Sequence, residues 1–199
     1  MITLVFWLMA AGMLAASVFA GSLRLWPLTV IILALCWDNA IVAAGALIGG
    51  GDLLFALSVP RYVAHGLLTP LLIPIVFWIA KLRLRAWMWI LTALLVALGA
   101  YTEILGLDLV LKEYGGTLRY AHAAASPPVP SIVTVLVLIG VGVLLWRRAG
   151  VPWLCLGALA MFGSAASGVF WLGNAGELAL IGSILATAAA LRSKAAPAR

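Results

Sequence analysis

Uninterrupted apolar stretches constrain this chain more than any other feature of its sequence. Each is about as long as the roughly 20 residues that a helix needs to cross the hydrocarbon core of a bilayer. The stretches do not alternate apolar and polar residues, and only helices and closed barrels satisfy their backbone inside lipid. We therefore predict an all-α, polytopic membrane bundle of about seven transmembrane helices. The predicted spans are residues 2–20, 25–48, 61–80, 86–104, 131–147, 150–172 and 174–191.

Composition supports the same class. The chain is 66% hydrophobic and 9% charged, with a mean hydropathy of +1.22, whereas roughly a quarter of the residues of a soluble domain are charged. Its 199 residues suffice for a single transmembrane domain covering 1–199. The turn WLGNAGE between the last two spans leaves six helices, one of them a long hairpin, as an alternative.

Two connections are long or unusual. We expect the glycine-rich segment 49–61 to re-enter the membrane or to lie along its surface. The external loop 105–130 is the longest stretch outside the spans, and its first part is predicted to form a short amphipathic helix at the interface. His122 lies in this loop and is expected to be solvated.

Basic residues gather in alternate loops, which predicts the orientation. Cytoplasmic loops carry an excess of Lys and Arg. An external N-terminus and a cytoplasmic C-terminus place nine of the twelve basic residues inside, and we expect a bacterial inner (plasma) membrane protein. The net charge of +6 then reflects orientation, so nucleic acid is not an expected partner. The nine residues are Arg24, Lys81, Arg83, Arg85, Arg147, Arg148, Arg192, Lys194 and Arg199.

Asp38 and Asn39 lie in the middle of the second predicted span. An ionised Asp at a helix centre costs about 2.5–3.5 kcal/mol on the mildest insertion scale. Such a residue faces the bundle interior, takes a partner or stays protonated. The candidate partners of Asp38 are Arg61 and His65, and interhelical hydrogen bonding that only holds the bundle together is the structural alternative.

The other polar side chains of the spans fall in the same, outer half of the membrane. Arg61, His65 and Thr69 follow one another at steps of four, so they share one helix face. We expect these residues to line one polar cavity with Asp38 and Asn39. The remaining predicted lining residues are Tyr101, Glu103, Asn174 and Glu177.

We assign Asp38, His65 and Glu177 as candidate catalytic residues. The candidate substrate-binding residues are Asn39, Arg61, Thr69, Tyr101, Glu103 and Asn174. The sequence identifies no cofactor and predicts no metal site, since it holds only two His. No Lys lies within a span, which excludes a retinal Schiff base. His65 as an axial ligand of a porphyrin-type pigment is an alternative.

Three functions are compatible with a one-sided polar cavity. The first is binding or processing of a lipid or isoprenoid-like substrate, with membrane lipids as partners, His65 and Asp38 as acid and base, and Arg61 on an anionic headgroup. The second is a structural or pigment-binding subunit, with other membrane proteins as partners. The third is a proton-coupled carrier that titrates Asp38, although the inner half offers little polar path.

Overall fold

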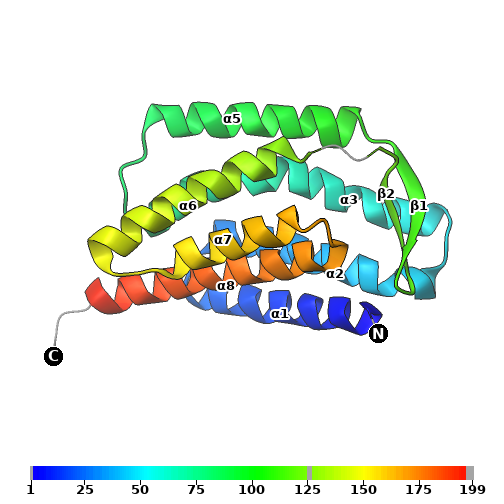
Figure 1. Cartoon of the computed structure of the whole chain (residues 1–199), viewed down its shortest axis with the longest axis horizontal. Helices are drawn as coiled ribbons and strands as arrows, with labels where there is room; N and C mark the ends of the chain where they lie inside the picture. The colour runs from blue at the N-terminus through cyan, green and yellow to red at the C-terminus, as the bar shows by residue number, and fades with distance from the viewer. Residues whose placement is uncertain (1, 125–126, 196–199) are drawn as a thin grey trace.

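Long helices account for most of the computed structural model, which describes residues 2–124 and 127–195 (Figure 1). A β-hairpin at one end of the bundle is the exception. The helical segments are α1 (Ile2–Ser22), α2 (Trp26–Ile48), α3 (Asp52–Leu68), η1 (Thr69–Leu71), α4 (Leu72–Ile79), α5 (Ala86–Ala100), η2 (Tyr101–Leu105), α6 (Val129–Ala149), α7 (Trp153–Ala166) and α8 (Phe170–Ala195).

Several of these segments join into longer rods. Residues Asp52–Ile79 form one apolar rod from α3, the 3₁₀ turn η1 and α4, and Ala86–Leu105 form another from α5 and the π-helical turn η2. Within the described residues the chain thus has seven helical rods, of which six are long and apolar enough to cross a membrane. The prediction of an all-α chain with about seven helices is confirmed. The sixth predicted span, 150–172, is a shorter helix of 14 residues.

The third rod begins earlier than the sequence analysis predicts. It starts at Asp52 rather than at residue 61, so most of segment 49–61 forms the first turns of α3. The Pro60 ring sits inside this helix, where proline removes a backbone hydrogen bond and favours a kink. Arg61 consequently lies nine residues into the helix rather than at its end.

The loop 105–130 contains a β-hairpin, so the prediction of an amphipathic helix there is wrong. Strands β1 (Leu109–Tyr114) and β2 (Thr117–His122) pair antiparallel. Gly115 and Gly116 form the turn with φ of +55° and +86°, the positive values that a tight two-residue hairpin loop requires. The register places Lys112 opposite Arg119. Residues 125 and 126 of the loop lie outside the described part of the chain.

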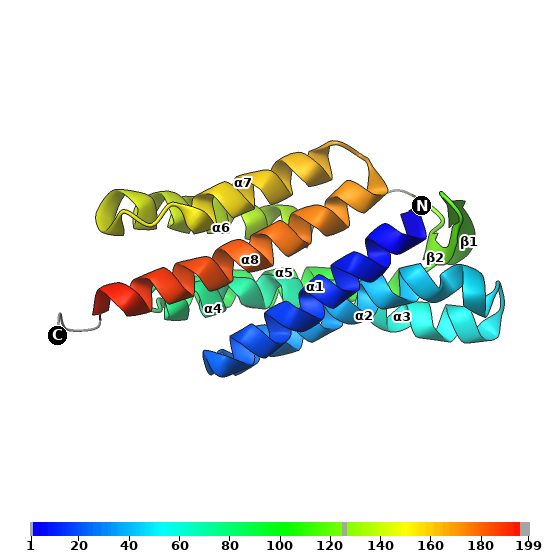
Figure 2. The same cartoon turned by 90° about the horizontal axis from the view of Figure 1, so that it is seen from below.

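The hairpin and the start of α1 lie at the same end of the bundle, which we call the hairpin end (Figures 1 and 2). The end of α8 lies at the opposite end, which we call the basic end (Figure 1). There Arg192 Nη2 donates to the Leu23 carbonyl oxygen, and Lys194 Nζ donates to that of Ala149. The predicted cytoplasmic loops are therefore neighbours at this basic end, although Arg199 lies outside the described residues.

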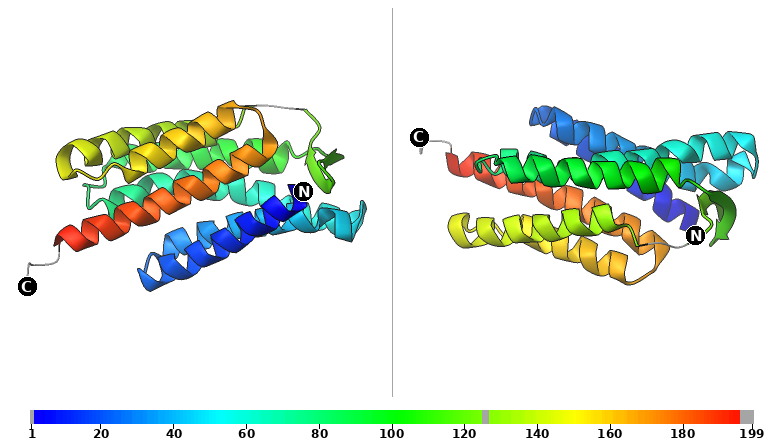
Figure 3. Two further views of the ribbon diagram at one scale, coloured as in Figure 1. Left: turned by 60° about the horizontal axis from the view of Figure 1, so that its bottom comes forward. Right: turned by 90° about the horizontal axis from the view of Figure 1, so that it is seen from above.

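Helices packed in chain order surround an apolar core. α2 packs against α1 and α3, and α8 packs against α7 and α1, which closes one side of the bundle (Figure 3). The largest apolar cluster extends from Leu25 and Leu145, near the basic end, to Met13, Ile73 and Ile181 farther in. The charged side chains within the spans lie outside this core, toward the hairpin end.

Candidate functional site

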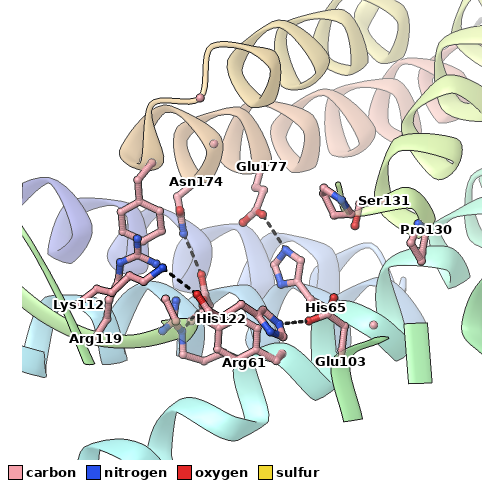
Figure 4. Close-up of a pocket in the computed structure, with 18 of the residues that line it drawn as sticks. Arg61, His65, Glu103, Lys112, Arg119, His122, Pro130, Ser131, Asn174 and Glu177 are labelled. Atoms are coloured by element: carbon pink, nitrogen blue, oxygen red, sulfur yellow. Dashed lines mark hydrogen bonds and ion pairs between the residues drawn. The ribbon is translucent and has the colours of Figure 1, made fainter. Parts of the chain in front are cut away.

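A cavity of about 560 Å³ lies at the hairpin end, where α2, α3, η2, the hairpin and the start of α8 converge (Figure 4). Cavities of this size are typical of small-molecule sites. Its wall contains small and apolar residues together with many titratable side chains. Such a concentration is unusual in a chain with so few charged residues. The titratable residues along the wall are Asp38, Arg61, Tyr62, His65, Glu103, Lys112, Arg119, His122 and Glu177.

Asp38 is held from two sides. Its Oδ1 accepts a hydrogen bond from Arg61 Nε, and its Oδ2 accepts one from Asn174 Nδ2 at 2.8 Å. Asp38 and Arg61 are only 6% and 5% exposed. Breaking such a buried pair by removing one charge is strongly destabilising, because the other charge is left uncompensated. The predicted partner Arg61 is confirmed, and Asn174 joins α8 to this pair.

His65 pairs with Glu177 rather than with Asp38. Its Nε2 lies 2.9 Å from Glu177 Oε1, and the ring remains about one third exposed, with 34% of its side-chain surface accessible. A carboxylate bonded to one ring nitrogen fixes the orientation of an imidazole. The pair therefore presents an oriented imidazole at the cavity wall, as a proton donor or acceptor requires.

A second imidazole–carboxylate pair lies on the same wall. His122 Nε2, from β2, is 2.7 Å from Glu103 Oε2. Glu103 belongs to η2, the π-helical turn that ends the α5 rod, and π-helical turns are frequent at functional sites. The Tyr62 ring lies edge-on to His122 with centroids 4.7 Å apart, and the Tyr62 hydroxyl donates to the Tyr120 carbonyl oxygen at 2.9 Å. His122 is thus a wall residue, not the solvated loop residue expected from the sequence.

The hairpin contributes two cations. Lys112 donates to the His122 carbonyl oxygen at 2.8 Å. The Arg119 guanidinium carbon lies 3.6 Å from the centroid of the Phe170 ring, a cation–π contact. Burial lowers the pKa of the Arg119 guanidinium from its usual value by desolvation, but arginine stays charged in proteins. Among the described residues, neither cation has a carboxylate within 4 Å.

Three buried polar atoms of the wall have no hydrogen-bond partner among the described residues. They are the donors Arg61 Nη1 and Arg119 Nε and the acceptor Glu177 Oε2. Buried polar groups are nearly always paired, because each unpaired group costs its desolvation energy. Residues next to the cavity therefore hold two unpaired donors, on Arg61 and Arg119, and one unpaired acceptor, on Glu177.

The structure gathers most, but not all, of the predicted residues. Asp38, Arg61, His65, Glu103, Asn174 and Glu177 line the cavity. Asn39 lies behind the wall and bonds to Leu35 and Asn174. Tyr101, 67% exposed, and Thr69, the first residue of η1, are not part of the lining.

Four titratable wall residues were not predicted from the sequence: Tyr62, Lys112, Arg119 and His122. Three of them come from the hairpin. The sequence does contain a hairpin pattern. Gly115 and Gly116 separate two runs that form strands, LVLKEY and TLRYAH.

Among residues 2–124 and 127–195, no three His, Cys, Asp or Glu side chains are grouped as metal ligands would be. No protein family, curated protein or solved structure matches the chain.

Proposed function

We propose that the protein binds, at the hairpin-end cavity, a lipid or isoprenoid-like amphiphile and processes its headgroup. The observation that carries this proposal is the His65–Glu177 pair, which opens on the cavity while Glu177 Oε2 has no partner among the described residues. A headgroup hydroxyl would find there an acceptor and an oriented imidazole, which is the arrangement of general acid–base catalysis.

The proposal gives different roles to the three candidate catalytic residues. His65 and Glu177 are the acid–base pair. Asp38 already accepts hydrogen bonds on both oxygens, so we propose that it positions Arg61 rather than exchanging a proton with substrate. With the N-terminus outside, as the basic loops favour, the cavity would take its ligand from the outer leaflet.

The carrier alternative receives less support. A proton-coupled carrier needs a polar path through the molecule. The bundle beyond the cavity is filled by the large apolar cluster that includes Leu28, Ile32 and Leu138. A carrier would also need Asp38 to release its two partners during each cycle.

Two glycines of α8 provide a matched test. A Cβ on Gly173 or on Gly182 would meet no atom within 4 Å, but only Gly173 lines the cavity. We expect wild type and Gly182→Leu, extracted in native-membrane polymer discs, to retain the same lipid in native mass spectra. Gly173→Leu should lose it, because the added side chain occupies the ligand's space. Equal lipid retention in all three proteins would overturn the proposal.

Catalysis is tested separately once that lipid is identified. His65→Gln and Glu177→Gln should still retain the lipid, because each keeps a polar group of similar size. Both should lower turnover of the lipid by about 100-fold or more, the usual contribution of general acid–base catalysis. Unchanged turnover in both variants would leave binding as the function and remove the catalytic step.

A further inference from the structure

The hairpin side of the cavity holds cations that the acid–base pair does not explain. Lys112 and Arg119 are direct cross-strand partners in β1 and β2. Like charges directly opposite each other destabilise a pair of strands. Both residues line the cavity, and among the described residues neither has a carboxylate within 4 Å. An anion bound between them would relieve this repulsion.

A third cation, Arg61, lies on the same wall and has a donor without a partner. Arg61 is 5% exposed and uses Nε for Asp38, while its Nη1 has no partner among the described residues. Arg119 likewise has a buried Nε without a partner among the described residues. All three cations line the same cavity (Figure 4). Two unpaired guanidinium donors and an ammonium group match an anion with several acceptor oxygens.

We propose that Arg61, Lys112 and Arg119 form a subsite for a terminal phosphoryl group, a phosphomonoester or a pyrophosphate. A terminal phosphoryl group carries up to two negative charges and three free oxygens, which suits two cations without carboxylate partners better than a singly charged carboxylate does. The cavity, at about 560 Å³, has room for more than a phosphate alone. In this form the inference rests on the proposed function, with the phosphoryl group as part of the amphiphile's headgroup.

The test compares three probes on the full-length protein purified in mild detergent. Dioctanoyl phosphatidic acid carries a terminal phosphate, dioctanoylglycerol has the same chains without it, and inorganic pyrophosphate has no chains. We expect phosphatidic acid to bind at least tenfold more tightly than dioctanoylglycerol. Arg119→Gln should weaken phosphatidic acid binding by about tenfold, as expected for losing charge-assisted hydrogen bonds, and should leave dioctanoylglycerol unaffected.

Two further variants keep the test decisive if Arg119→Gln fails to fold. Lys112 is exposed, so Lys112→Gln should fold normally and weaken phosphatidic acid binding by a smaller factor of about threefold. Arg83→Gln removes an exposed charge at the basic end and should change nothing. Thermal unfolding of each variant identifies any loss that is due to misfolding.

The outcomes separate the two proposals. Equal binding of phosphatidic acid and dioctanoylglycerol, unaffected by the hairpin variants, would overturn the phosphoryl subsite and leave amphiphile binding intact. Binding of pyrophosphate alone, weakened by Arg119→Gln, would support the subsite as a site for a free phosphate and would overturn the proposed amphiphile. Binding of no probe would overturn both.

Discussion

The backbones of Gly66 and Gly99 touch where α3 passes α5. A Cβ atom on Gly99 would lie 2.2 Å from the Gly66 carbonyl oxygen, and one on Gly66 would lie 2.8 Å from that of Gly99. A Cβ on Gly66 would also lie 3.0 Å from the Cβ of Glu103. The contact therefore sets how closely η2 and its carboxylate approach the helix that carries His65.

Gly99→Ala is expected to destabilise the bundle. The added methyl group collides with backbone, which cannot rotate away, so the two helices must separate at a cost of about 1–3 kcal/mol. Thermal unfolding in detergent measures the effect. Gly140→Ala is the control, because a Cβ on that α6 glycine meets nothing within 4 Å. Equal midpoints for the two variants would contradict the close contact.

Asp38→Asn should destabilise the protein by about 3–5 kcal/mol, because it leaves the buried Arg61 guanidinium without a counter-charge. The double variant Asp38→Asn/Arg61→Gln removes both charges and should recover a large part of that loss. Unfolding in sodium dodecyl sulfate gives the free energies of both proteins. A double variant no more stable than Asp38→Asn would show that the two charges do not compensate each other.

Gly45→Ala should loosen the hairpin. A Cβ at this α2 position would lie 1.7 Å from the Leu118 carbonyl oxygen in β2, so the strand must move outward. We expect amide hydrogen exchange over 109–122 to accelerate about tenfold or more, since overpacking costs about 1–3 kcal/mol and 1.4 kcal/mol is a factor of ten. Gly163→Ala in α7, where a Cβ has open space, should leave exchange there unchanged.

Cysteine labelling tests the predicted orientation. In a background with Cys36→Ala and Cys155→Ala, the exposed positions Arg83 and Glu113 each receive a cysteine in turn. On intact cells a membrane-impermeant maleimide should modify Glu113→Cys, in the hairpin, and should reach Arg83→Cys only after permeabilisation. The reverse pattern would place the cavity on the cytoplasmic side.

Sequence patterns predicted most of the rods because the length of an apolar stretch is a local property. Asp38, Arg61 and His65 were found as one polar set for the same reason, since a charge inside an apolar run needs a partner. Their pairing was not readable from the sequence. Whether His65 meets Asp38 or Glu177 depends on the rotation of α3 against α2 and α8, and His65 and Glu177 lie 112 residues apart along the chain.

The hairpin shows a different limit. Its strands are short and contain polar residues, so they resemble a loop beside runs of Leu and Val. The paired glycines at 115 and 116 were the one local cue. The packing of β2 against α2 could not be predicted even if the hairpin were recognised. It depends on the absence of a side chain at Gly45, a relationship between distant positions that no local pattern encodes.

The shortness of α7 has a consequence for the surrounding lipid. Its 14 residues span about 21 Å at 1.5 Å per residue, against a hydrocarbon thickness of about 30 Å. Local thinning is one way in which a bilayer meets such hydrophobic mismatch. Gly168 and Phe170, which follow α7, line the cavity, so a bilayer patch thinned around α7 would adjoin the cavity. Lipid headgroups beside α7 would then sit deeper than elsewhere around the protein, close to the level of the charged wall.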